Sequence, residues 1–87
     1  MRVTKHGERR VRKRFGVPRK AVIGVAQTAL SCGLRHREAR GKLRRYLDGV
    51  FLREGKADNL RVYAGYVFVF TGDTLLTVWR VPPGVMR

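Results

Sequence analysis

Residues 59–81, with the sequence NLRVYAGYVFVFTGDTLLTVWRV, carry the clearest structural signal in this chain. Their side chains alternate in character with a period of two, which is typical of β-strands. Two pairs of turn-forming residues, Ala64-Gly65 and Gly72-Asp73, interrupt the alternation and fit two-residue hairpin loops. The pattern therefore predicts three antiparallel strands, at 60–64, 66–71 and 74–81.

Two-residue loops also predict which residues lie opposite each other. Val62 would face Val67 and Leu60 would face Val69, and across the second turn Val69 would face Leu76 and Val67 would face Val78. One face of the sheet is then aliphatic and suited to receive helices. The other face has Arg61, Tyr63, Tyr66, Phe68, Phe70, Leu75, Thr77 and Trp79. This aromatic face is either a second packing surface or a platform on which nucleic-acid bases stack.

The sequence before this stretch is helical in pattern. Gly7, Val11 and Phe15 recur every four residues, which predicts a helix over Lys5–Phe15. Gly16 would end this helix and Pro18 would open a second one over 18–31. A third helix is expected over 36–53, a loop over 54–59 and a short strand over 2–4. The expected fold is a single α+β domain over 1–87, with about three N-terminal helices on one face of a three- to four-stranded antiparallel meander sheet.

Positive charge is concentrated in the first half of the chain. The formal net charge is +14, and residues 1–45 hold fifteen Lys and Arg residues against Glu8 and Glu38. Self-repulsion of this size is relieved by a polyanionic partner, of which nucleic acid is the commonest. An anionic membrane surface or an acidic protein is the alternative partner. The residues expected to contact nucleic acid are Lys5, Arg9, Arg10, Arg12, Lys13, Arg14, Arg19, Lys20, Arg37, Arg40, Arg44, Arg45, Tyr63, Tyr66 and Trp79.

Other classes of site have little support in the sequence. The longest apolar run, AVIGVAQTAL over 21–30, is far shorter than the roughly 20 residues that span a bilayer. Phosphate-binding loops, paired carboxylates and metal-ligand spacings are missing, so we expect neither a cofactor nor a metal. Cys32 is the single cysteine, which fits a reducing compartment and a cytoplasmic location.

One line of side chains suggests catalysis on RNA. His6, Arg10 and Arg14 share a helical face beside the apolar one. RNA is cleaved without a metal when a base activates its 2′-hydroxyl against the adjacent phosphate, which requires a proton acceptor and cations near the phosphate. His6 would supply the acceptor, and Arg10 with Arg61 would supply the cations. The alternative is a helix-terminal histidine without a chemical role.

Two segments resemble a known family. The stretch TKHGERRVRKRFGV (4–17) resembles the T-x-H-(A/G)-x-x-R-x-x-x-R opening of small domains in the barnase–EndoU–colicin–RelE group of metal-independent ribonuclease folds. TLLTVWRVP (74–82) resembles their closing strand with its central Thr. The resemblance implies a RelE-like fold, catalytic roles for His6, Arg10 and Thr77, and cleft positions for Arg61, Tyr63 and Tyr66. For a toxin of this kind it also implies an acidic, antitoxin-like protein partner.

The expected function is therefore RNA binding, with toxin-like endoribonuclease activity as its most specific form. Two alternatives stay open. A non-catalytic protein that binds nucleic acid needs only the arginine-rich helices, and a phage or mobile-element inhibitor would dock on a nucleoprotein complex through the same charges.

Overall fold

The computed structural model describes residues 1–85 and shows an α+β fold, as predicted. A five-stranded sheet has the order β1-β5-β4-β3-β2. Its strands are β1 (Arg2–Val3), β2 (Leu34–Arg35), β3 (Asn59–Tyr63), β4 (Tyr66–Thr71) and β5 (Thr74–Arg80). The expectation of a three- to four-stranded antiparallel meander is wrong in two respects, because β2 extends the sheet at one edge and β1 pairs parallel to β5 at the other.

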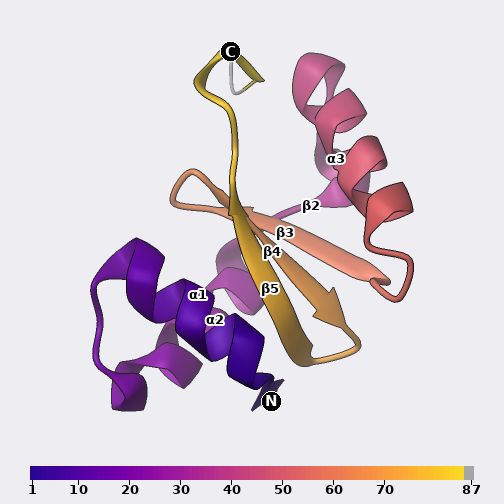
Figure 1. Ribbon diagram of the computed structural model, residues 1–87. Coiled ribbons are helices and arrows are strands. Elements are labelled where there is room, and N and C mark those ends of the chain that lie inside the picture. Colours follow the sequence, from indigo (N-terminus) through magenta and orange to yellow (C-terminus); the bar gives the residue numbers. More distant parts are fainter. Residues whose placement is uncertain (86–87) are drawn as a thin grey trace.

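Helices cover both faces of the sheet, which corrects the expectation that they share one face (Figure 1). Helices α1 (Lys5–Phe15) and α2 (Val22–Cys32) pack on one side, against buried residues of β4 and β5 that include Phe68, Phe70 and Val78. Helix α3 (Gly41–Arg53) packs on the other side, against the aliphatic residues of β3 and β4. Phe68 and Phe70 of the predicted aromatic face are thus buried in a second hydrophobic core, beneath α1 and α2.

The helix boundaries follow local signals. Helix α1 begins and ends as predicted, with Thr4 as its N-cap and Gly16 in a left-handed conformation as its C-cap. The other two predicted helices start too early. Residues 19–21 and 36–38 form separate 3-10 turns, and a third such turn spans Pro83–Val85. The backbone at Ala39 and Arg40 is extended, with ψ of 152° and 160°, so α3 starts only at Gly41.

The first hairpin has the predicted register and the second does not. Val62 lies opposite Val67 and Leu60 opposite Val69, across a turn in which Ala64 and Gly65 both have positive φ. In the second hairpin Phe70 still lies opposite Leu75, but Val69 lies opposite Thr77 rather than Leu76.

Leu76 is the extra residue of a β-bulge, where two residues of one strand oppose one of its neighbour. Beyond the bulge every side chain of β5 has changed face relative to the prediction. Val78 joins the core beneath α1 and α2, and Trp79 packs on the α3 side of the sheet. The bulge therefore separates Trp79 from Tyr63 and Tyr66, with which it was expected to form one surface.

Candidate functional site

The start of α1 is attached directly to the bulged part of β5. The Thr4 amide donates to the Leu75 carbonyl over 3.0 Å, and the Thr4 hydroxyl donates to the Leu76 carbonyl over 3.0 Å. The same hydroxyl accepts from the Gly7 amide over 2.9 Å and so caps the helix. One threonine thus anchors both the helix terminus and the bulge.

Gly7 allows α1 to approach β5 closely. A Cβ atom at this position would lie 3.0 Å from the Leu75 carbonyl oxygen and 3.3 Å from that of Leu76, which is tighter than ordinary packing. Both contacts are with backbone atoms, which cannot rotate away. The sequence Thr4-Lys5-His6-Gly7 is therefore a docking motif, in which Thr4 and Gly7 position the histidine against the strand.

This docking brings two of the predicted catalytic residues together. The His6 Nε2 atom lies 3.1 Å from the Thr77 hydroxyl, within hydrogen-bond distance. Thr77 is buried and His6 is exposed, so the strand holds the hydroxyl in place while the imidazole faces solvent. The bulge brings about this contact, because it sets the face of β5 on which Thr77 lies.

One turn further along α1, Arg10 reaches the indole ring of Trp79. The Arg10 guanidinium carbon lies 4.7 Å from the ring centroid, and that of Arg53, at the end of α3, lies 5.8 Å from it. The Trp79 Nε1 donates to the Glu54 carboxylate over 3.0 Å. Contacts of this kind contribute about 0.5–2 kcal/mol each and hold the arginine side chains over the ring.

These side chains form one group, which we call the α1–β5 site: His6, Arg10, Arg53, Glu54, Thr77 and Trp79. It combines an exposed imidazole, two guanidinium groups and one carboxylate. Such a set can transfer protons and bind a phosphate. The sequence predicted catalytic roles for His6, Arg10 and Thr77. It predicted that Trp79 contacts nucleic acid.

Arg53 and Glu54 were not anticipated from the sequence, nor were Thr4 and Gly7. The Thr-x-x-Gly spacing ahead of an apolar helical pattern was an available signal for the last two, since threonine is a common N-cap. No local pattern marks Arg53 or Glu54. They reach the site only because α3 packs on the face to which the bulge turns Trp79.

Arg61, the remaining predicted catalytic residue, lies elsewhere. Strand β3, which carries it, is separated from β5 by β4. Its guanidinium donates to the Leu30 carbonyl near the end of α2 and, over 3.1 Å, to the Asn59 side chain. Partial burial lowers the pKa of Arg61, and the neighbouring charge of Arg35 lowers it further. The structure thus assigns Arg61 contacts that tie β3 to α2, away from His6.

The predicted aromatic surface is mostly interior. Phe68 and Phe70 are fully buried, which confirms the packing interpretation for these two residues. Tyr66 packs with Phe15 of α1, their ring centroids 4.8 Å apart, and Tyr63 lies edge-on to Phe68. Both tyrosines are half-buried against the core beneath α1 and α2. Whether they contact nucleic acid stays a prediction.

The predicted basic residues occupy two regions of the surface. Lys5, Arg9, Arg12, Lys13, Arg14, Arg19 and Lys20 are exposed on α1 and the turn that follows it. Arg37, Arg40, Arg44 and Arg45 are exposed around the start of α3. Glu8 pairs with Arg19 over 3.1 Å and with Arg12 over 4.0 Å, and the other cations of the first region form no ion pair within residues 1–85.

The part of the chain that the structure describes contains no cluster of three or more metal-ligating side chains. Nor does any helix within it have the length and apolar character needed to cross a membrane. No protein family, curated protein or solved structure was found to match the chain. Its function is therefore inferred from the geometry of the site.

Proposed function

We propose that the protein binds RNA and cleaves it without a metal ion, with the α1–β5 site as the catalytic centre. The observation that carries this proposal is the hydrogen-bond contact between His6 and Thr77 at 3.1 Å, one helical turn from the Arg10–Trp79 contact. A solvent-facing imidazole oriented by a buried hydroxyl, beside a guanidinium, is the arrangement that acid–base chemistry on a phosphodiester needs.

The proposed reaction is an internal transfer at phosphorus. The 2′-hydroxyl loses its proton as its oxygen bonds to the adjacent phosphorus, and the bond from phosphorus to the 5′-oxygen breaks. The products are a 2′,3′-cyclic phosphate and a 5′-hydroxyl that has gained a proton. His6 would transfer a proton at one of these two oxygens, and Thr77 would hold its ring in the productive orientation. Arg10 would stabilise the charge on the phosphorane-like transition state.

The rest of the surface supports binding of a polyanion. A net charge of +14 and two exposed groups of arginines favour a phosphate backbone over a neutral ligand. The likeness of residues 4–17 and 74–82 to RelE-like ribonucleases is consistent with the proposal, because the two segments that carry it meet at the α1–β5 site. We propose by the same likeness a cytoplasmic toxin with an acidic protein partner.

A second candidate is a protein that binds nucleic acid without cleaving it, including an inhibitor that docks on a nucleoprotein complex. Arg10 and Arg53 favour this alternative, because both guanidinium groups already lie near the Trp79 ring. Such an assembly offers a flat, positively charged surface to a nucleotide without any need for proton transfer.

The deciding experiment is cleavage of labelled RNA by the purified protein in EDTA. We expect products that end in a 2′,3′-cyclic phosphate, and a loss on the order of 10²-fold or more in cleavage rate for His6→Ala, with RNA affinity nearly unchanged. Thr77→Val keeps the side-chain shape and removes the hydroxyl, so it should slow cleavage while the fold is kept. Thr28→Val, on the surface of α2, is the matched control.

Binding without cleavage, across several RNAs, would refute the enzyme and favour the second candidate. Equal cleavage by wild-type protein and His6→Ala would remove His6 from the reaction.

A further inference from the structure

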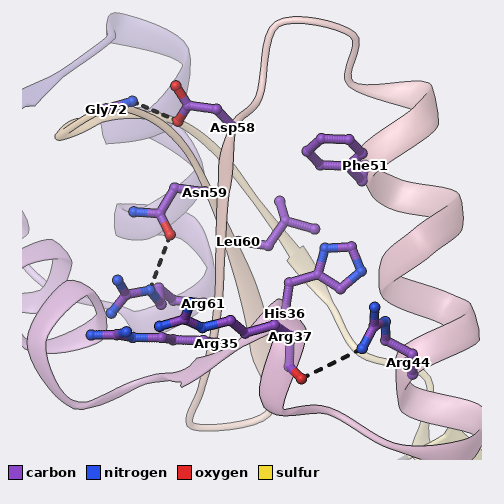
Figure 2. Close-up of a pocket in the computed structure, with 10 residues that line it drawn as sticks. All are labelled: Arg35, His36, Arg37, Arg44, Phe51, Asp58, Asn59, Leu60, Arg61 and Gly72. Carbon is purple, nitrogen blue, oxygen red and sulfur yellow. Dashed lines mark hydrogen bonds between the residues drawn. The ribbon is translucent and has the colours of Figure 1, made fainter.

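A cavity lies at the opposite edge of the sheet from the α1–β5 site. It has a volume of about 500 Å³, within the range of small-molecule sites, and lies between the 3-10 turn at 36–38, α3 and β3 (Figure 2). Arg35, Arg37, Arg44, Arg61, His36 and Phe51 contribute to its lining. None of these six residues belongs to the α1–β5 site.

Three guanidinium groups gather at one end of this cavity (Figure 2). Arg35 and Arg61 lie directly opposite each other on β2 and β3, and Arg37 follows two residues later. Burial is the main cause of the lowered pKa of Arg61; the charges of Arg35 and Arg37 lower it further, whereas Glu38 raises it. Like charges so near to one another destabilise the fold unless an anion binds between them.

The acidic residues around the cavity already have partners. The Glu38 carboxylate accepts from the Arg35 amide over 2.9 Å, and Asp58 accepts from the Gly72 amide over 2.8 Å. Asp48 accepts from His36 over 2.6 Å and from Arg44 over 3.2 Å. No carboxylate is hydrogen-bonded to the side chains of the three gathered arginines within residues 1–85. The side chains of Arg35 and Arg37 are therefore available to a phosphate, whose oxygens suit guanidinium groups well. Arg61 can add only the N–H groups that it does not donate to Leu30 and Asn59.

The α3 side of the cavity is aromatic. Phe51 is 41% exposed, although a large apolar side chain on a helix normally faces the core. Its ring lies 5.8 Å from the His36 ring, and Asp48 holds that imidazole in place. Figure 2 shows Leu60 between these rings and the arginine end. A flat, exposed ring on one side of the cavity and a cationic end on the other suit a group that carries a planar base and a phosphate.

We propose that this cavity binds a nucleoside phosphate, with the phosphate at Arg35, Arg37 and Arg61 and the base against Phe51. The ligand is either a free nucleotide or one nucleotide of an RNA strand, since both present the same chemistry. His6 does not line this cavity, so nucleotide binding can be tested separately from the cleavage reaction.

The test is calorimetric titration of the full chain with adenosine 5′-monophosphate, adenosine and inorganic phosphate in low-salt buffer. We expect the nucleotide to bind at least about tenfold more tightly than either part alone, because both ends of the cavity then contribute. Arg35→Gln with Arg37→Gln should weaken nucleotide binding at least about tenfold. Arg2→Gln with Arg80→Gln removes the same charge from exposed positions of β1 and β5 and should leave binding unchanged.

Phe51→Ala separates a nucleotide site from a simple anion site. Loss of a base-stacking surface should weaken nucleotide binding by about 5- to 150-fold and leave phosphate binding unaltered. Because Phe51 is partly exposed, the variant should stay folded, which thermal unfolding will verify. Inorganic phosphate binding as tightly as the nucleotide, with Phe51→Ala equal to wild type, would overturn the proposal, as would equal effects of the two double arginine variants.

Two further binding measurements complete the experiment. A short RNA with 2′-O-methyl groups, which cannot be cleaved, should compete with the nucleotide if the site holds part of a strand, and should not compete if the ligand is free. His6→Ala should bind the nucleotide as wild type does. Loss of nucleotide binding in His6→Ala, with Arg35 and Arg37 intact, would place the ligand at the α1–β5 site and refute a second site.

Discussion

The two histidines have different partners and therefore different chemistry. His6 contacts the neutral hydroxyl of Thr77, which orients a ring without adding charge. His36 contacts the Asp48 carboxylate at 2.6 Å, and Arg44 contacts the same carboxylate at 3.2 Å. The His36 ring is half-buried and its carboxylate partner is shared with Arg44, whereas the His6 ring is exposed beside a single hydroxyl. The geometry thus suits His6 to proton transfer and His36 to a structural contact.

The contacts of Asp48 with His36 and Arg44 predict how its carboxyl group titrates. The hydrogen bond from His36, followed by the hydrogen bond and charge of Arg44, holds the pKa of Asp48 below its usual range. Because the folded-state pKa is depressed, the stabilisation is present above the unfolded-state pKa and is lost as pH falls through the folded one. His36→Leu should raise the pKa of Asp48 towards its usual value. The measurement is the NMR titration of the Asp48 carboxyl carbon.

Arg44→Leu is the companion variant and should raise the Asp48 pKa by less than His36→Leu does. An Asp48 titration that is the same in His36→Leu and wild-type protein would show that this contact does not exist in solution.

The start of helix α1 is held against strand β5 by direct contacts at the bulge. The helix is anchored by Thr4 to two carbonyls at the bulge, and Gly7 brings the two backbones together. Bulges commonly re-aim side chains near functional sites, and here the bulge directs Thr77 and Trp79 towards His6 and Arg10. The distance between helix and strand therefore controls the geometry of the α1–β5 site.

Two glycine-to-alanine substitutions test this dependence. Gly7→Ala should lower stability, although alanine is the better helix former, because its Cβ would meet the Leu75 carbonyl oxygen at 3.0 Å. It should also slow RNA cleavage by moving His6 from Thr77. Gly49→Ala, on the open surface of α3, meets nothing within 4 Å and should raise stability by about 0.5–1 kcal/mol. Denaturant unfolding measures both, and a stabilising Gly7→Ala would contradict the close docking.

Positive charge lies in two groups on the surface of the fold rather than in a single cluster. One group of cations lies on α1 and the turn after it, at the β1–β5 edge of the sheet, and another lies around the start of α3, at the β2–β3 edge. Such a distribution allows a polyanion to contact both edges of the sheet. It is also consistent with the two separate nucleotide contacts that we propose, at the α1–β5 site and in the cavity beside α3.

The charge predicts a steep dependence of RNA affinity on salt. With about six phosphates bound, the logarithm of the association constant for single-stranded RNA should fall with the logarithm of salt concentration, with a slope of about −4. Arg12→Gln with Arg14→Gln should flatten this slope by roughly 0.7 for each phosphate that the variant no longer neutralises. Fluorescence anisotropy over a salt series measures it. An affinity that does not change with salt would exclude the electrostatic basis of binding.

Much of the fold was predictable because it depends on neighbours in the chain. The bounds of α1 follow from a cap at each end, and the first hairpin follows from a turn of two residues and an alternating pattern. The proposed preference for a polyanion rests on composition alone. Helical spacing suggested catalytic roles for His6 and Arg10, and the resemblance suggested one for Thr77; the structure brings His6 and Thr77 into contact, and their roles stay a prediction.

The bulge, the parallel pairing of β1 and the position of α3 depend on contacts between distant residues. Leu75 and Leu76 are both leucine, so their hydrophobicity does not reveal which one continues the alternation and which one is the extra residue. The Thr4 hydroxyl binds the Leu76 carbonyl across 72 positions of sequence, and no local pattern records that bond. For this reason the composition of the α1–β5 site, with Trp79 beside Arg10 and Arg61 at the far edge, emerges only when the chain is folded.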